Sequence, residues 1–145
     1  MAKRNTLKLT TSGFEELITK LDELGGDIMS VVEDALTQAG ETIGEDTVEA
    51  VDNAYLPAKG KYSKGDTKKS VIRNPKVEWN GTIASVEVGF DYSKKGAGGF
   101  LITGTPRMKP DYELQKIYKK KPYMKQIETE MIDVVQSAIT EKLGG

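Results

Sequence analysis

The sequence contains no cysteine and no histidine. Without cysteine, the chain can form no disulfide bond, no thiolate nucleophile and no cysteine-ligated metal site. Without histidine, it lacks the commonest general base and metal ligand of proteins, and every catalytic triad built on an imidazole is excluded. Carboxylates, lysines, tyrosines and hydroxyl groups remain. We therefore expect a protein that is not an enzyme and that binds no cofactor or metal.

Long apolar runs are also missing. The longest fall far short of the roughly 20 residues that a membrane-spanning helix needs. The basic start, residues 1–6, is not followed by the apolar segment of a signal peptide. We therefore expect no membrane partner and a chain that stays in the cytoplasm in which it is made.

The overall composition is that of a folded protein. The chain has 145 residues, of which 37% are hydrophobic and 30% charged. A chain of this length is the size of one domain and buries roughly two thirds of the surface that it exposes when unfolded. We expect a single domain, 1–145, with a modest core and a highly charged surface.

The small net charge of −1 hides a division along the chain. Residues 14–54 contain twelve acidic residues and one basic residue, which gives a net charge of −11. Residues 56–121 contain fifteen basic and six acidic residues, which gives +9. Charge asymmetry of this kind bears on partners and association, not on the fold.

The first elements expected are a strand and a helix. Residues 5–10 alternate apolar and polar side chains, a pattern typical of a half-buried strand. Ser12 and Glu15 have the spacing of a capping box, and apolar residues at helical spacing follow them. The pattern predicts a helix over 12–25 that ends at Gly25-Gly26.

A second, longer helix is predicted over 27–54. Asp27 is a good N-terminal cap, and the helix should end before Pro57, because proline lacks the amide that a helix needs. Gly40 and Gly44 each lower the helix propensity by roughly 1 kcal/mol relative to alanine. Their presence suggests close packing or a bend.

The second half of the chain alternates loops with β-rich segments. Residues 55–67 read as a mobile loop, and residues 70–104 as a β-rich part that contains a flexible loop, 93–99. Two strands, 71–79 and 82–90, should form a hairpin through Asn80-Gly81, a strong turn signal. In the second strand, one face should consist of Ala84, Val86, Val88 and Phe90.

The remaining segments are mostly helical. Residues 100–103 fit either a short strand or a helical turn, and 111–119 can form a short helix. A C-terminal helix should span 123–143. The fold class expected is α+β, a small antiparallel sheet with a central hairpin packed against N-terminal and C-terminal helices.

Two basic clusters are the main candidates for an interaction site. One consists of Lys59, Lys61, Lys64, Lys68, Lys69 and Arg73, and the other of Arg107, Lys109, Lys116, Lys119, Lys120 and Lys121, interleaved with Tyr112, Tyr118 and Tyr123. Basic and aromatic residues in alternation suit the binding of nucleic acid. A surface that is solvated or faces a protein partner is the favoured alternative, because the acidic helices supply complementary charge. Lys94 and Lys95 form a third, smaller basic group.

A glycine-rich loop, residues 96–99, follows Lys94 and Lys95. A phosphate-binding loop needs a preceding strand and a helix that begins directly after it. The residues that follow here are apolar and β-prone, and no Gly-Lys-Ser/Thr occurs. We therefore interpret this loop as flexible rather than phosphate-binding.

Several short motifs, taken in order, resemble the gene-product-ten-like head-tail joining or tail-completion proteins of long-tailed bacteriophages. They are Gly13-Phe14-Glu15-Glu16-Leu17 with Leu21 and Leu24-Gly25; Pro57 with Gly65-Asp66-Thr67-Lys68-Lys69-Ser70-Val71-Ile72; Phe100-Leu101 with Gly104-Thr105 and Met108; and Pro122-Tyr123-Met124. The resemblance covers nearly the whole chain. Thr67 departs from it, since that family has an apolar residue there, and the basic link 109–121 is longer than usual.

The resemblance implies a non-catalytic virion protein of the neck or the top of the tail. Such a protein would form a ring with copies of itself, as a hexamer, and would contact head-connector and tail-tube or terminator proteins, with non-specific contact to passing DNA. The interface or DNA-facing residues expected are Lys59, Lys61, Lys64, Lys68, Lys69, Lys94, Lys95, Arg107 and Lys109. A small nucleic-acid-binding domain is the alternative.

Overall fold

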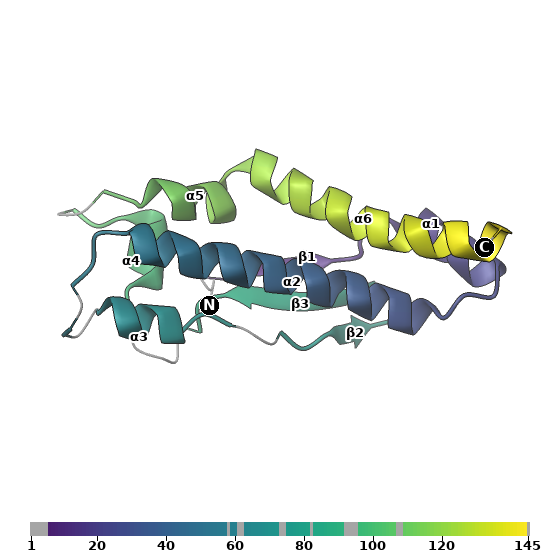
Figure 1. Ribbon diagram of the computed structural model, residues 1–145, viewed down its shortest axis with the longest axis horizontal. Coiled ribbons are helices and arrows are strands. Elements are labelled where there is room, and N and C mark those ends of the chain that lie inside the picture. Colours follow the sequence, from purple (N-terminus) through teal and green to yellow (C-terminus); the bar gives the residue numbers. More distant parts are fainter. Residues whose placement is uncertain are drawn as a thin grey trace.

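The computed structural model describes residues 6–57, 59–60, 63–72, 75–81, 83–91, 96–106 and 109–144. They form the α+β fold that the sequence predicts, drawn out along one axis (Figure 1). The strands are β1 (Thr6–Thr10), β2 (Glu78–Asn80) and β3 (Ile83–Gly89). The helices are α1 (Glu15–Glu23), α2 (Ile28–Asn53), α3 (Lys64–Lys69), α4 (Gly98–Thr103), α5 (Tyr112–Lys119) and α6 (Lys121–Gly144).

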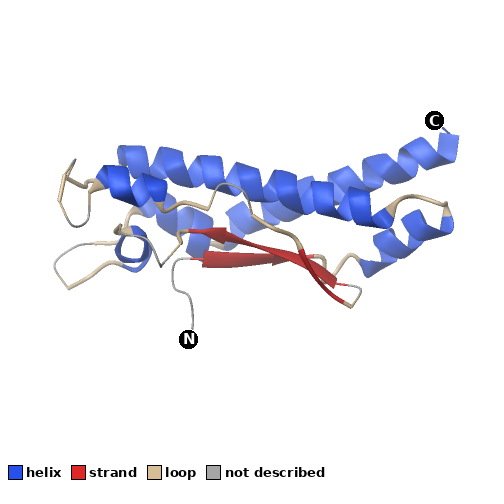
Figure 2. Ribbon diagram, turned by 90° about the horizontal axis from the view of Figure 1, so that it is seen from below, coloured by secondary structure: helices blue, strands red, loops and turns tan. Residues whose placement is uncertain are grey.

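The helices and the sheet form two layers (Figure 2). Helix α2 lies along the sheet and contacts α6 and α5, while α1 packs on α6. Fully buried side chains from both layers meet between them, among them Leu36, Ile43, Met131 and Phe90. Burial of one such side chain contributes about 1.5–3 kcal/mol, so this interface is the main source of stability. Among the described helices, none is long and apolar enough to cross a membrane.

The sheet is antiparallel, with the strand order β1-β3-β2. Leu7 lies opposite Val88, and Leu9 lies opposite Val86. The predicted apolar face of the second hairpin strand is confirmed, since Ala84, Val86, Val88 and Phe90 are all buried. The predicted hairpin is also present, with Asn80 paired to Ile83 and the turn beginning at Gly81, whose φ angle is +64°.

The first predicted strand of that hairpin, 71–79, is wrong over most of its length. Only Glu78–Asn80 pairs as a strand, and Val71 makes an isolated bridge to Phe90. Of the described residues between them, Ile72 and Pro75 lie against α2. A Cβ atom on Gly40 would lie 2.7 Å from Cγ of Pro75, and one on Gly44 would lie 3.4 Å from the carbonyl oxygen of Ile72. Gly40 therefore permits close packing, as predicted, whereas a Cβ atom on Gly44 would make an ordinary contact. The packing of Pro75 on α2 replaces strand pairing at this point.

Helix α1 begins three residues later than predicted, and its capping box is absent. The N-cap is Phe14, which makes no side-chain cap, and the Glu15 carboxylate instead accepts a hydrogen bond from the Gly13 amide at 2.9 Å. Gly13 has a φ angle of +107°, which turns the chain before the helix starts. By contrast, Asp27 caps α2 as predicted and accepts from the Ser30 amide at 3.1 Å.

The predicted loop 55–67 is partly wrong, because α3 begins at Lys64. Ser63 caps this helix by accepting a hydrogen bond from the Asp66 amide at 3.1 Å. Thr67, fully buried, donates to the carbonyl of Ser63 at 2.8 Å and accepts from the amide of Ala97 at 2.9 Å. The departure of Thr67 from the family pattern thus has a structural reason, since its hydroxyl joins α3 to the start of α4.

The loop 93–99 is also shorter than predicted. Residues 93–95 lie outside the described part of the chain, and Gly98 and Gly99 already belong to α4. Residues 100–103 belong to helix α4. Of the two structures predicted for this segment, the helical turn is therefore confirmed and the strand is wrong. The inference that a β-prone segment follows the glycine-rich loop was therefore wrong. A Cβ atom on Gly98 would collide with the ring of Phe90, which explains why glycine opens this helix.

The last two helices follow the prediction closely. Asp111 caps α5 and accepts from the Leu114 amide at 3.0 Å. Helix α6 runs from Lys121 to Gly144, two residues earlier at its start than the pattern predicts. Ile127, Met131, Val135 and Ile139 form its buried stripe.

Candidate interaction surface

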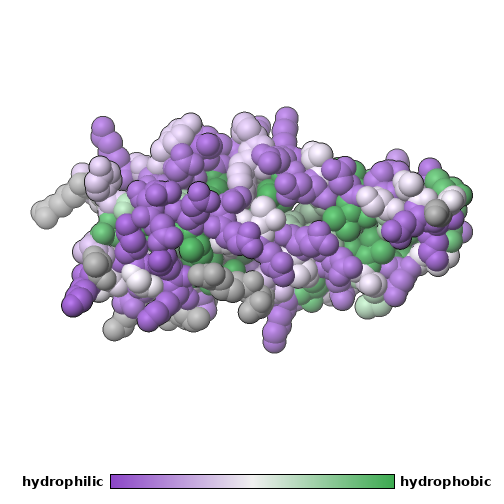
Figure 3. Space-filling view, viewed as in Figure 1, coloured by the Kyte–Doolittle hydropathy of each residue, from purple (hydrophilic) through white to green (hydrophobic). Residues whose placement is uncertain are grey.

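Five exposed carboxylates lie on the outward face of α2. Their spacing of three, four or seven residues places them on one side of a helix; they are Asp34, Glu41, Glu45, Glu49 and Asp52, and we call them the acidic ridge. Figure 3 shows the predominantly hydrophilic surface over this helix. Like charges four residues apart disfavour a helix by about 0.2–0.5 kcal/mol per pair. The ridge therefore does not stabilise the chain that carries it.

Lysines gather at the end of the molecule where α2 finishes. The segments that carry them are the stretch after α2, α3 and the approach to α5, which lie together at the left of Figure 1. We call this the basic end; its described lysines are Lys59, Lys64, Lys68, Lys69 and Lys109. The described residues at this end also include Asp66 and Asp111. The opposite end, built from α1 and the start of α2, is the acidic end and carries Glu15, Glu16, Asp22, Glu23 and Asp27 with Lys20.

The acidic ridge and the basic end touch within one chain. The ammonium group of Lys68 lies 2.7 Å from Oδ1 of Asp52, the last carboxylate of the ridge. The Lys64 ammonium group donates to the Asp52 carbonyl at 2.8 Å. An exposed ion pair of this kind contributes about 1 kcal/mol or less. The contact nevertheless shows that lysines of α3 fit against carboxylates of α2.

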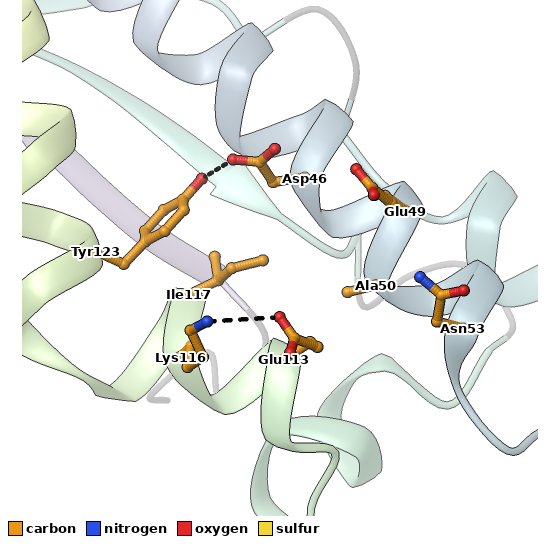
Figure 4. A pocket seen from close by; sticks show the side chains of 8 residues that line it. All are labelled: Asp46, Glu49, Ala50, Asn53, Glu113, Lys116, Ile117 and Tyr123. Atoms are coloured by element: carbon orange, nitrogen blue, oxygen red, sulfur yellow. Dashed lines mark hydrogen bonds and ion pairs between the residues drawn. The ribbon is translucent and has the colours of Figure 1, made fainter.

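An open recess lies between α2, α5 and the start of α6 (Figure 4). It has a volume of about 460 Å³, a floor that includes Ala50 and Ile117, and a rim with Asp46, Glu49 and Glu113. Its eight lining residues include no serine, threonine or cysteine. Lys116 pairs with Glu113 at 3.7 Å. The recess therefore suits a cationic group with an apolar stem better than a nucleophilic reaction.

Tyr123, which lines this recess, links two helices through a hydrogen bond. The hydroxyl group of Tyr123 donates to Oδ2 of Asp46 at 2.6 Å, which joins α6 to α2 (Figure 4). Burial raises the pKa of Tyr123, and the bond to Asp46 raises that pKa further. The phenol therefore stays protonated and remains a donor at neutral pH.

The basic-aromatic cluster of residues 107–123 is only partly a surface. Tyr118 is buried against Phe90, with ring centroids 6.2 Å apart, and Tyr123 is half-buried. Only Tyr112 of the three tyrosines is exposed, and the Lys116 ammonium group lies 5.5 Å from its ring centroid. The tyrosines and lysines that alternate in this part of the sequence therefore lie partly in the core and partly on the surface.

The structure separates the other predicted residues into several roles. Gly65 is exposed in α3, whereas Ser70 is buried and ends that helix. Gly104 ends α4 with a φ angle of +78°, which favours glycine. Thr105 is half-buried, and Phe100 and Pro122 are exposed. Six predicted residues lie outside the described part of the chain: Lys61, Arg73, Lys94, Lys95, Arg107 and Met108.

Sequence reasoning missed three exposed apolar side chains. Tyr55 is 99% exposed, Leu143 is 61% exposed and Met29 is 59% exposed. A signal for Met29 was present, because it lies outside the apolar stripe of its helix. Tyr55 gave no such signal, since it follows the end of α2 and has no periodic pattern around it.

No known family model matches the chain, and no curated protein or solved structure shows significant similarity to it. Within the described residues, no group of three acidic, histidine or cysteine residues has an arrangement that could hold a metal ion. The case for a function therefore rests on the shape, the surface charges and the sequence motifs of this chain.

Proposed function

We propose that this protein is a structural subunit of the head-tail connector or tail-completion region of a long-tailed bacteriophage, where it forms a ring with copies of itself. The observation that carries the proposal is the separation of charge in space. The acidic ridge and acidic end present carboxylates, whereas lysines gather at the basic end. Contacts between two different surfaces of identical subunits make rings when they close. The order of the sequence motifs supplies the phage context.

The electrostatics favour association between copies. The acidic end sets several carboxylates close together within one chain, and the basic end of another copy would relieve the repulsion between them. The pair between Lys68 and Asp52 is an example of the same chemistry inside one chain. We infer a non-catalytic role, because the protein offers surfaces of complementary charge and the residues that line its recess include no serine, threonine or cysteine.

A nucleic-acid-binding domain is the second candidate. Tyr112 lies exposed beside Lys116 near the basic end, and such an arrangement can stack a base and contact a phosphate. Binding to single-stranded or duplex DNA would weaken steeply with salt. Absence of binding at low ionic strength would remove this candidate.

Multi-angle light scattering over a range of protein concentrations tests the ring. The chain should be measured alone and with the connector and tail-tube proteins encoded beside its gene. We expect a closed oligomer that dissociates near 1 M salt, where the Debye length falls to about 3 Å. A strict monomer under all of these conditions would sink the proposal.

Charge reversal at the acidic end supplies a matched pair of variants. Glu23→Lys lies at the acidic end, and Glu128→Lys lies at an exposed position of α6 outside it. Both change the net charge equally. We expect the first variant to weaken assembly and the second to leave it close to that of the parent; equal effects would mean that only total charge matters.

A further inference from the structure

The large hydrophobic side chains that the described part of the chain exposes are concentrated at its two ends. Six are exposed by more than a third: Met29, Tyr55, Ile83, Phe100, Tyr112 and Leu143. Ile83 begins β3 and alternates with the buried Ala84, so it lies on the face of the sheet that points away from the helices. The other five belong to segments at opposite ends of the long axis (Figure 1).

The basic end combines aromatic side chains with lysines. Tyr55 follows the last turn of α2 and is 99% exposed, and Tyr112 opens α5 and is 67% exposed. Exposed lysines lie in the same segments, at Lys59 and Lys109. Tyrosine is enriched in protein interfaces because one ring buries a large apolar area while its hydroxyl group can still bond.

The acidic end combines aliphatic side chains with carboxylates. Met29 lies in the first turn of α2, and Leu143 lies in the last turn of α6. Exposed carboxylates precede α2, at Glu23 and Asp27, and the last turn of α6 places the exposed Glu141 and Lys142 beside Leu143. Methionine is flexible and polarizable, which suits it to packing against an aromatic ring. Each end therefore offers apolar groups and a charge that the other end complements.

We propose that the basic end of one copy docks on the acidic end of the next, with Tyr55 and Tyr112 packing near Met29 and Leu143. The two ends lie at opposite extremes of the molecule, so a single chain cannot bring them together, whereas a second copy can (Figure 1). The contact joins two different surfaces, so each copy can bind two neighbours, and a ring forms when the rotation between successive copies closes. This inference rests on the proposed ring and specifies the surface that holds it.

The first experiment compares Tyr55→Ser/Tyr112→Ser with the control Ile83→Ser. All three side chains are exposed, and circular dichroism with urea unfolding should show that every variant keeps its fold. Loss of an interface aromatic commonly costs more than 1 kcal/mol. The double variant should therefore assemble at least about tenfold more weakly than the parent by light scattering, since 1.4 kcal/mol is tenfold in affinity. Ile83→Ser should assemble as the parent does.

The second experiment tests whether the contact joins the basic end of one copy to the acidic end of another. Tyr55→Ser/Tyr112→Ser blocks the basic end, and Met29→Ser/Leu143→Ser blocks the acidic end. Each double variant alone should fail to assemble. An equimolar mixture retains one intact junction, formed by the acidic end of the first variant and the basic end of the second. It should therefore give a one-to-one heterodimer and nothing larger.

The outcomes separate this inference from the proposed function. A ring that assembles equally well in both double variants overturns the end-to-end contact and leaves the ring intact. A chain that stays monomeric even with connector and tube proteins overturns both. If the tyrosine variant loses affinity for DNA while its self-association is unchanged, the basic end is a nucleic-acid surface and the contact between copies is overturned.

Discussion

The hydroxyl groups of Tyr118 and Thr47 lie 2.8 Å apart in the core, where α5 meets α2. The Thr47 hydroxyl already donates to the carbonyl of Ile43 at 2.6 Å, so Tyr118 donates and Thr47 accepts. This bond satisfies the only polar atom of a side chain that is otherwise packed among apolar groups. It anchors the helix that forms one wall of the recess.

We expect the free energy of unfolding to fall at alkaline pH. Burial raises the pKa of Tyr118 above its ordinary value of 10.0. The unfolded chain then loses the phenolic proton before the folded chain does, so stability is fully present below about pH 10 and is lost as the pH rises further. Urea unfolding between pH 8 and pH 11 should show this slope.

Substitution separates Tyr118 from Tyr123, whose pKa is also raised by burial. Tyr118→Phe should reduce the alkaline slope, and at pH 7 it should cost about 0.5–1.5 kcal/mol for the lost hydrogen bond. Tyr55→Phe, at a fully exposed position, is the control and should keep the slope of the parent. An unchanged slope in Tyr118→Phe would assign the alkaline loss to other groups.

Two glycines of α2 should respond differently to the same substitution. Alanine raises helix propensity equally at both sites. At Gly40, however, the new Cβ would lie 2.7 Å from Pro75, whereas at Gly44 its nearest neighbour would lie at 3.4 Å. We expect Gly40→Ala to be about 1–3 kcal/mol less stable than Gly44→Ala, the usual range for overpacking. Thermal or urea unfolding of the two variants measures this difference, and equal stabilities would show that the segment around Pro75 moves away without cost.

Removal of the Thr67 hydroxyl should destabilise the junction of α3 and α4. Thr67→Val leaves the buried amide of Ala97 without its acceptor, and such a loss costs about 1–3 kcal/mol. Thr129→Val is the matched control, because that hydroxyl is exposed and donates only to the carbonyl of Lys125 in its own helix. Urea unfolding should show a clear loss for the first variant alone; similar losses would indicate a general effect of valine in helices.

The single tryptophan should report the docking of β2 on α2. Nε1 of Trp79 donates to Oε2 of Glu33 at 2.9 Å, which joins the sheet edge to the helix layer. Glu33→Ala should shift the tryptophan emission to longer wavelength, because the indole N–H then turns to water. The neighbouring exposed variant, Asp34→Ala, should leave the emission unchanged. An identical spectrum for Glu33→Ala would mean that the packing of the ring, not this bond, holds β2.

The long, regular elements could be predicted from the sequence. The apolar stripes of α2 and α6, the cap at Asp27 and the hairpin turn at Gly81 are all local signals, and the structure contains each of them. The buried face of β3 also followed from simple alternation. These features depend on periodicity and turn chemistry, which act over a few residues.

The features that failed depend on contacts between distant residues. The segment before β2 has β-forming residues, yet it packs on α2, because Gly40 leaves room for Pro75. Tyr118 and Tyr123 read as surface aromatics beside lysines, yet Tyr118 bonds to Thr47 in the core and Tyr123 bonds to Asp46 at the recess. The local sequence pattern around the two tyrosines gives no indication of Thr47 or Asp46, which lie more than 70 residues away in the chain.

The surface also has some features that follow from the sequence and others that depend on the tertiary structure. The sequence by itself determined that acidic and basic residues occupy separate halves of the chain, since this follows from counting charges. The spacing of the five ridge carboxylates also put them on one side of α2. Only the tertiary structure decided that this side faces outward and that Tyr55 and Tyr112 lie among the lysines of one end. The physical reason is that burial against the sheet sets which side of each helix meets water, and chain connectivity alone does not specify that packing.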